Sequence, residues 1–184
     1  MTRKKSPLRR AAPKVLGVVL VLALIGTILF SVFRERIERW EYPIQYQEYV
    51  TYYADKYDLD PLMLYTFIRT ESNFDPRAES DAGARGLMQI TEVTFDWIKS
   101  KIAPTEPLTF EDLFDPETNI RFGSYFVSYC LLRYSDDLAT AAAAEYSADG
   151  LTLDHYPYPQ MRLYVRKITE GYQRYQEIYT DYEK

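Results

Sequence analysis

An uncharged apolar run near the N-terminus divides this sequence into two parts of different character. It extends from Val15 to Phe33 without a charged side chain. At 1.5 Å per residue, a helix of that length crosses a hydrocarbon layer of about 30 Å. We therefore expect one transmembrane helix over 15–33, with residues 1–14 as a basic cytoplasmic tail and the remainder of the chain outside the cell membrane. The basic residues of this tail are Arg3, Lys4, Lys5, Arg9, Arg10 and Lys14.

A cleaved signal peptide is the alternative interpretation of this run. Signal peptides have a shorter apolar region, followed by small residues at a cleavage site. Here the run ends in Phe30, Val32 and Phe33 and passes directly into charged residues, which favours an uncleaved signal anchor. Residues 34–45 are then expected to form a juxtamembrane linker, and residues 46–184 a single folded domain.

The part of the chain that follows the run is acidic. The whole sequence carries a formal charge of -5, but without the six basic residues of the tail, 16 basic and 27 acidic residues leave -11. An acidic domain repels a phosphate backbone, so nucleic acid is not an expected partner. Hydrophobic residues make up 47% of the chain, enough for a core without stabilising disulfides or metal ions.

Cysteine and histidine each occur once, as Cys130 and His155. This count excludes an intrachain disulfide and zinc sites built from Cys and His clusters, and we expect neither a metal ion nor another cofactor. A Cys-His catalytic pair stays possible from composition alone. However, Cys130 lies in an apolar helical run, where a buried thiol that packs as a small hydrophobe is the simpler interpretation.

The pattern beyond residue 45 is helical. Apolar and aromatic side chains recur at three- and four-residue spacing from Tyr46 to Tyr57, as on one face of an amphipathic helix. Asp-Pro pairs provide an N-cap and a first helical residue for helices over 61–72 and from Pro116 to about Tyr134. Because no segment shows sustained strand alternation, the predicted class is all-α, with long loops over 73–90 and 148–159. Three further helices are expected: one capped by Thr91, one over 137–146 and one from about Gln160 to Tyr179.

One glutamate lies where this pattern predicts an apolar side chain. Glu71 follows Leu64 by seven residues and Phe67 by four, so its carboxylate shares their helix face. Desolvation disfavours the charged form and raises the pKa, which makes a carboxylic acid a usable proton donor near neutral pH. A solvated glutamate at the end of the helix is the alternative that position alone leaves open.

Two sequence segments, the first of which begins at Glu71, resemble those of a known family. Residues 71–78 read Glu-Ser-Asn-Phe-Asp-Pro-Arg-Ala, and residues 83–89 read Gly-Ala-Arg-Gly-Leu-Met-Gln. In this order and spacing they resemble the soluble lytic transglycosylase family, which has a lysozyme-like helical domain of the goose-type lysozyme class. Residues 113–123 resemble a third family segment at the start of a core helix, where we expect capping and packing roles. The resemblance covers nearly the whole domain from about Tyr46.

The resemblance implies a peptidoglycan lytic transglycosylase, which cleaves the β-1,4 bond between N-acetylmuramic acid and N-acetylglucosamine and leaves 1,6-anhydro ends. Glu71 would protonate the leaving oxygen and then accept the proton of the 6-hydroxyl of the same sugar. Tyr146 would orient Glu71 by hydrogen bonding. Ser80 and Gln89 would bind sugar hydroxyl or acetamido groups, and Met88 would line the pocket or pack in the core. The expected partners are glycan strands and, through the N-terminal helix, the membrane; the sequence identifies no protein partner.

Two segments depart from the family pattern. Ser147 and Asp149 stand where the family has asparagine and glycine, although Tyr146 is kept. Near the C-terminus, Gln160 and Met161 replace a glutamate and a threonine. Gln160 can still form hydrogen bonds, so we expect it to contact the sugar.

Two other functions remain open from the residues. Asp75, Glu79 and Asp81 lie near enough in sequence to Glu71 to provide a second carboxylate, which would make the protein a muramidase-type hydrolase. The departures at 147, 149, 160 and 161 instead favour a catalytically weak, glycan-binding scaffold at the membrane. Substitution of Glu71 separates these functions, because a scaffold would lose nothing.

Overall fold

The computed structural model describes residues 7–133 and 159–180. The chain forms two compact units, Met1–Pro43 and Ile44–Lys184. The expected helix over 137–146 and most of the loop over 148–159 lie outside the described residues, as do the side chains of Gln160 and Met161.

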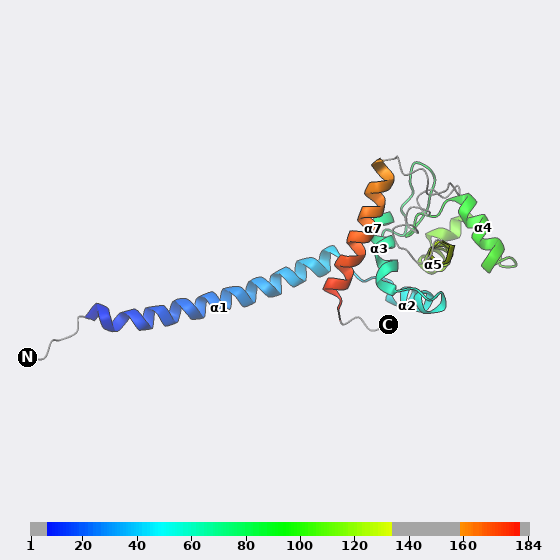
Figure 1. Cartoon of the computed structure of the whole chain (residues 1–184). Helices are drawn as coiled ribbons and strands as arrows, with labels where there is room; N and C mark the ends of the chain where they lie inside the picture. Colours follow the sequence, from blue (N-terminus) through cyan, green and yellow to red (C-terminus); the bar gives the residue numbers. More distant parts are fainter. Residues whose placement is uncertain (1–6, 134–158, 181–184) are drawn as a thin grey trace, which may run out of the picture. The chain divides into compact units, whose positions relative to one another are not determined.

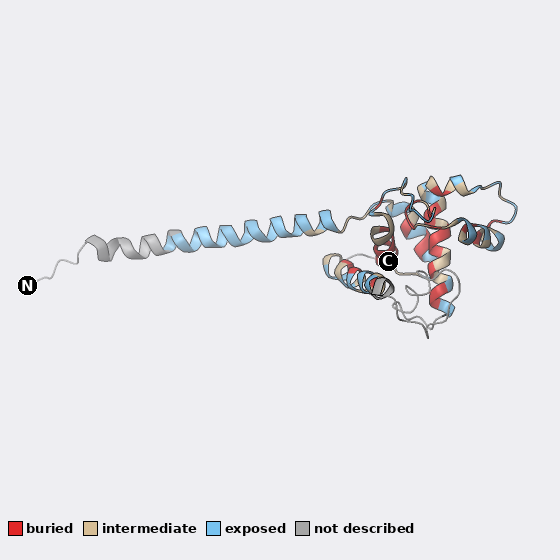
Figure 2. Ribbon diagram, turned by 90° about the horizontal axis from the view of Figure 1, so that it is seen from above, coloured by how far each residue is buried: buried red, intermediate tan, exposed pale blue. Residues whose placement is uncertain are grey.

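The first unit contains one helix, α1 (Pro7–Glu41) (Figure 1). It includes the whole apolar run that begins at Val15. Large apolar side chains are exposed along it from Val19 to Phe33, and the described part appears pale blue throughout this stretch in Figure 2. Among the residues that the structure describes, no helix has the combined length and apolar character needed to span a membrane.

The second unit is helical, in agreement with the predicted all-α class. No strand is formed within its described residues, where pairing is limited to two isolated bridges, Glu79 with Arg85 and Arg85 with Ile90. The short 3-10 helix η1 was not expected from the sequence. The elements are α2 (Gln47–Lys56), α3 (Pro61–Ser72), α4 (Glu92–Ile102), η1 (Phe110–Phe114), α5 (Pro116–Arg133) and α7 (Pro159–Ile178).

Side-chain caps fix where three of these helices begin. The Asp60 carboxylate accepts a hydrogen bond from the Leu62 amide at 2.9 Å, and the Asp115 carboxylate accepts one from the Thr118 amide at 2.9 Å. Thr91 caps α4 in the same way. These bonds satisfy amides that have no partner within the helix, so the predicted caps and the predicted 61–72 helix are confirmed.

The core of the second unit surrounds α3. Leu64, Tyr65, Phe67 and Ile68 are at most 1% exposed, and Figure 2 shows buried residues along the inward faces of the packed helices. On the other side of the core, Phe95 of α4 stacks on Phe122 of α5 with ring centroids 5.2 Å apart. Burial of these large side chains is the main force that holds the helices together.

Helix α7 packs along α3 (Figure 1). The ring of Tyr175 stacks on that of Tyr65 at 6.0 Å. Gly171 lets the two backbones approach, since a Cβ there would lie 3.1 Å from Thr66 Cγ2. The Tyr172 hydroxyl donates to Asp60 Oδ2 at 2.7 Å. These contacts fix α7 against α3, and therefore fix the position of the residues one and two turns earlier in α7.

Candidate active site

A compact loop over 78–90 forms one wall of the site. Its turns are closed by backbone hydrogen bonds between Ser80 and Ala84 and between Arg85 and Ile90, at 3.0 to 3.1 Å. Gly86 has φ +74°, and a Cβ there would lie 2.3 Å from the Leu113 carbonyl oxygen. Only glycine combines this φ with so close an approach, which explains the second glycine of the segment.

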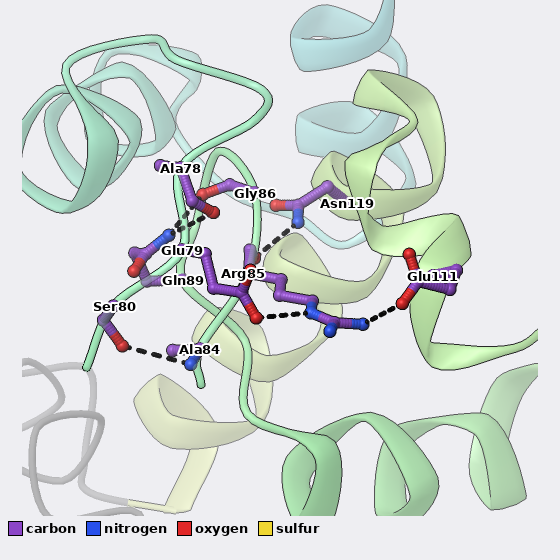
Figure 3. A network of polar contacts seen from close by, with 9 residues as sticks. All are labelled: Ala78, Glu79, Ser80, Ala84, Arg85, Gly86, Gln89, Glu111 and Asn119. Atoms are coloured by element: carbon purple, nitrogen blue, oxygen red, sulfur yellow. Dashed lines mark hydrogen bonds and ion pairs between the residues drawn. The ribbon is translucent and has the colours of Figure 1, made fainter. Parts of the chain in front are cut away.

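Asn119 of α5 holds this loop in place (Figure 3). The side chain is fully buried. Its Oδ1 accepts from the Met88 amide at 2.8 Å, and its Nδ2 donates to the carbonyl oxygens of Arg85 at 3.0 Å and Leu113 at 2.8 Å. One amide therefore connects α5, η1 and the loop. The sequence suggested only capping and packing for this segment.

Arg85 directs its guanidinium away from this amide and binds two glutamates. Its Nε donates to Glu79 at 3.2 Å and its Nη1 to Glu111 at 2.7 Å (Figure 3). The guanidinium also lies 4.3 Å from the centroid of the Phe110 ring, a cation–π geometry. Glu79, one candidate for a second carboxylate, is thus engaged by Arg85.

A pocket of about 260 Å³ lies between this loop and the helices. Its lining includes Glu71, Ser80, Met88 and Gln89, four side chains for which the resemblance implied roles. Glu71 is the only carboxylate among the described residues that line it, and Asp75 and Asp81 are exposed elsewhere. The remaining lining residues are Ala84, Ile90, Thr91, Thr94, Phe126 and Tyr164.

Burial raises the pKa of the Glu71 carboxyl from 4.5 to about 7. A hydrogen bond from the Tyr164 hydroxyl and the positive charge of Lys167 act in the opposite direction and favour the carboxylate. Desolvation is the larger effect, as expected for a glutamate on an apolar helix face. Near pH 7 this group can both donate and accept a proton, which is the property required of an acid and base.

Tyr164 is a site residue that the sequence analysis did not select. Its hydroxyl donates to Glu71 Oε1 across a separation of 93 residues. Tyr164 lies in the predicted final helix, four residues after Gln160, but nothing in the local pattern indicates a contact with Glu71. Tyr146, which was predicted to orient Glu71, lies outside the described residues, as do Ser147 and Asp149.

The predicted sugar-binding side chains are held by the loop itself. The Gln89 amide nitrogen donates to the carbonyl oxygens of Ala78 at 3.2 Å and Gly86 at 2.9 Å. This assigns the amide orientation and leaves Oε1 as the group that can accept from a ligand. Ser80 Oγ accepts from the Ala84 amide at 3.1 Å, a contact that does not use its hydroxyl hydrogen.

Met88 lies at the boundary between the pocket and the core. It lines the pocket, yet its side chain is only 3% exposed. A Cβ at Gly123 of α5 would lie 2.2 Å from Met88 Sδ, so the thioether packs directly on that glycine. The Met88 side chain therefore packs between the pocket and α5.

This fold and site define a class: a helical, lysozyme-like domain with a partly buried glutamate, Glu71, in a pocket beside the loop over 78–90. Solved structures agree with the fold. A lytic transglycosylase Slt from Pseudomonas aeruginosa, solved as an inactive mutant, gives a TM-score of 0.68 at 23% identity, over 77% of this chain and 25% of that one. The 70 kDa soluble lytic transglycosylase of Escherichia coli gives a TM-score of 0.68 at 22% identity, over 76% of this chain and 25% of that one.

Residues 48–150, more than half of the chain, match the model of the transglycosylase SLT domain. The chain belongs to this family. It is 31% identical to membrane-bound lytic murein transglycosylase F of Desulfosudis oleivorans, over 66% of this chain and 30% of that protein. It is 28% identical to the soluble lytic murein transglycosylase of Salmonella typhimurium, over 70% of this chain and 20% of that protein. The chain thus spans less than a third of the length of these relatives.

Proposed function

We propose that this protein is a peptidoglycan lytic transglycosylase that cleaves the β-1,4 bond between N-acetylmuramic acid and N-acetylglucosamine. The observation that carries the proposal is Glu71, a partly buried carboxyl with a pKa of about 7 in a pocket beside Ser80 and Gln89. Family membership and relatives named as lytic murein transglycosylases support the same activity.

In the first step, protonated Glu71 donates its proton to the glycosidic oxygen. The bond from C1 of the muramic acid to that oxygen breaks, and the bonding electrons leave with the oxygen. Positive charge develops on the sugar ring, as in other glycoside cleavages. The resulting Glu71 carboxylate is stabilised by the Tyr164 hydroxyl and by its attraction to the developing charge.

In the second step, the carboxylate removes the proton of the 6-hydroxyl of the same muramic acid. That oxygen then bonds to C1 and closes the 1,6-anhydro ring, while Glu71 returns to its protonated form. No water is consumed and no second carboxylate is required. A pKa near 7 suits a group that must give and take one proton in each turnover.

A hydrolase would need a second carboxylate near the bond. Within the described residues, Glu71 has no such partner in the pocket lining, and Glu79 is bound to Arg85. This supports the lytic reaction over hydrolysis. The raised pKa of Glu71 supports catalysis over a scaffold role, because glycan binding alone does not require a protonated carboxyl.

The other side chains are proposed to bind the sugar. Gln89 Oε1 would accept from a sugar hydroxyl or acetamido N–H, and the Ser80 hydroxyl would donate to a sugar oxygen. Met88 would contact the apolar face of the ring. As the resemblance implies, Tyr146 would orient Glu71 by hydrogen bonding. Gln160, which departs from the family pattern but can still form hydrogen bonds, would contact the sugar.

Mass spectrometry of the products tests the reaction. Purified peptidoglycan is incubated with the full chain or with Glu71→Gln, and the released muropeptides are analysed. Anhydro-muramic ends that disappear with the variant would support the proposal. Reducing ends would indicate a hydrolase, and no release by either protein would favour the scaffold function.

We also propose that the N-terminal unit associates with the membrane, with residues 15–33 as the single-pass anchor and the second unit outside the cell. The support is the uncharged run, its basic flank and the exposed apolar side chains of α1. Relatives named as membrane-bound transglycosylases add to it. Alkaline extraction of membranes tests this, because an anchored chain stays in the pellet while deletion of residues 1–34 releases it.

A further inference from the structure

Three aromatic side chains form a continuous group beside the pocket, which we call the aromatic strip: Trp97 of α4, and Phe126 and Tyr129 of α5. The Trp97 ring lies 4.8 Å from that of Tyr129 and 6.1 Å from that of Phe126, both in edge-to-face geometry. Such contacts fix the rings relative to one another. The strip is therefore a preformed surface.

The aromatic strip continues directly from the pocket. Phe126 and Thr94 line the pocket. Trp97 follows Thr94 by three residues and Tyr129 follows Phe126 by three, so each pair lies on one helix face. Three residues advance about 4.5 Å along a helix, a step comparable with the length of one sugar ring.

The strip is accessible to a ligand. Tyr129 is 38% exposed, and Trp97 and Phe126 are partly exposed. Its three side chains carry no charge, while the phenol and the indole N–H can form hydrogen bonds at the edges of the rings. Apolar ring faces with polar groups at their edges match a sugar, which has apolar C–H faces and equatorial hydroxyls.

The pocket alone is small for a polymer. Its volume of about 260 Å³ is below the roughly 300 to 1,000 Å³ of sites that enclose a drug-sized ligand. A glycan strand with its scissile bond at Glu71 must therefore continue across the adjoining surface. The aromatic strip is contiguous with the pocket wall at Phe126.

We propose that the aromatic strip binds sugar residues of the strand beyond those at Glu71, by stacking on Trp97 and Tyr129. This inference rests on the proposed function, since it names a further binding surface for the same glycan. It makes Trp97 and Tyr129 determinants of affinity for long strands. Neither residue takes part in proton transfer.

Tryptophan fluorescence gives a direct test. The chain has two tryptophans, so Trp40→Phe leaves Trp97 as the single reporter. The full chain carrying Trp40→Phe and Glu71→Gln is titrated with a β-1,4-linked N-acetylglucosamine hexamer. We expect a saturable change in Trp97 emission. Adding Tyr129→Ala should raise the Kd for the hexamer about tenfold, equivalent to about 1.4 kcal/mol, with the Tm used to verify folding.

Tyr52→Ala in the same background is the matched control. Tyr52 is a 59% exposed tyrosine on α2 and lies outside the strip, so its removal should leave the Kd unchanged. Hexamer binding without a change in Trp97 emission, or equal Kd values for Tyr129→Ala and Tyr52→Ala, would overturn the inference. The titration uses an inactive variant, so its result is separable from the product analysis: anhydro products without strip binding would remove this inference and retain the proposed reaction.

Discussion

Replacing Tyr164 by phenylalanine should move the pH dependence of the reaction upward. The Tyr164 hydroxyl donates to Glu71 Oε1 and lowers the pKa of a carboxyl that burial raises to about 7. A hydrogen bond to a charged group contributes roughly 1.5 to 3 kcal/mol, and one pKa unit corresponds to about 1.36 kcal/mol. Loss of the hydroxyl should thus raise the Glu71 pKa further, by about one to two units.

The assay is the initial rate of anhydro-muropeptide release between pH 5 and 9. The free enzyme must hold Glu71 protonated for the first step, so kcat/KM falls as pH rises through its pKa. For the natural chain this decline should centre near pH 7, and for Tyr164→Phe about one to two units higher. The maximal rate should decrease, because the carboxylate formed in the first step has lost a donor.

Tyr172→Phe is the matched control on the same helix. Its hydroxyl donates to Asp60 Oδ2 at 2.7 Å, so its removal should lower stability while the alkaline decline stays near pH 7. A Tyr164→Phe profile that is unchanged, or shifted to lower pH, would refute the assigned direction of the hydrogen bond's effect on Glu71.

Three further predictions concern stability. Because the pKa of Glu71 is raised in the folded state, the free energy of unfolding should fall as the pH rises from about 4.5 through 7. Glu71→Gln removes this loss, so it should raise the free energy of unfolding at pH 8 by up to about 3 kcal/mol and change it little at pH 5. Urea titrations at the two pH values measure the difference. Gly86→Ala should destabilise by about 3 kcal/mol or more, since its Cβ would meet Asn119 and the Leu113 carbonyl; an unchanged Tm would contradict this. Asn119→Ala should cost a similar amount, because the buried Met88 amide loses its acceptor, and hydrogen exchange at Met88 should accelerate.

Local features of the fold were predictable because neighbouring residues determine them. Asp60 and Pro61 gave the start of α3, and the end of its apolar pattern placed the last helical residue at Ser72, as observed. The position of Glu71 on the apolar face indicated its raised pKa by the same local logic. A cap or a helix face involves residues a few positions apart, so a sequence pattern contains the required information.

Contacts between distant segments were not predictable in this way. Nothing near Asn119 indicates that its amide holds a loop more than thirty residues earlier in the chain. The Tyr164 hydrogen bond to Glu71 likewise depends on how α7 packs on α3. The 3-10 helix at 110–114 was missed because it has a single turn, and its capping residues Thr109 and Asp112 are equally common in loops.

The docking of α7 also has a consequence for the order in which the site is completed. The Tyr164 hydroxyl, which contacts Glu71, belongs to α7, a late segment of the chain. The hydrogen bond from Tyr172 to Asp60, across 112 residues, holds this helix in place. Until that segment has been synthesised and packed, Glu71 lacks the Tyr164 donor and the nearby Lys167 charge, both of which favour its carboxylate. The opposing effects on the Glu71 pKa, burial on one side and these two groups on the other, are therefore complete only once α7 has packed on α3.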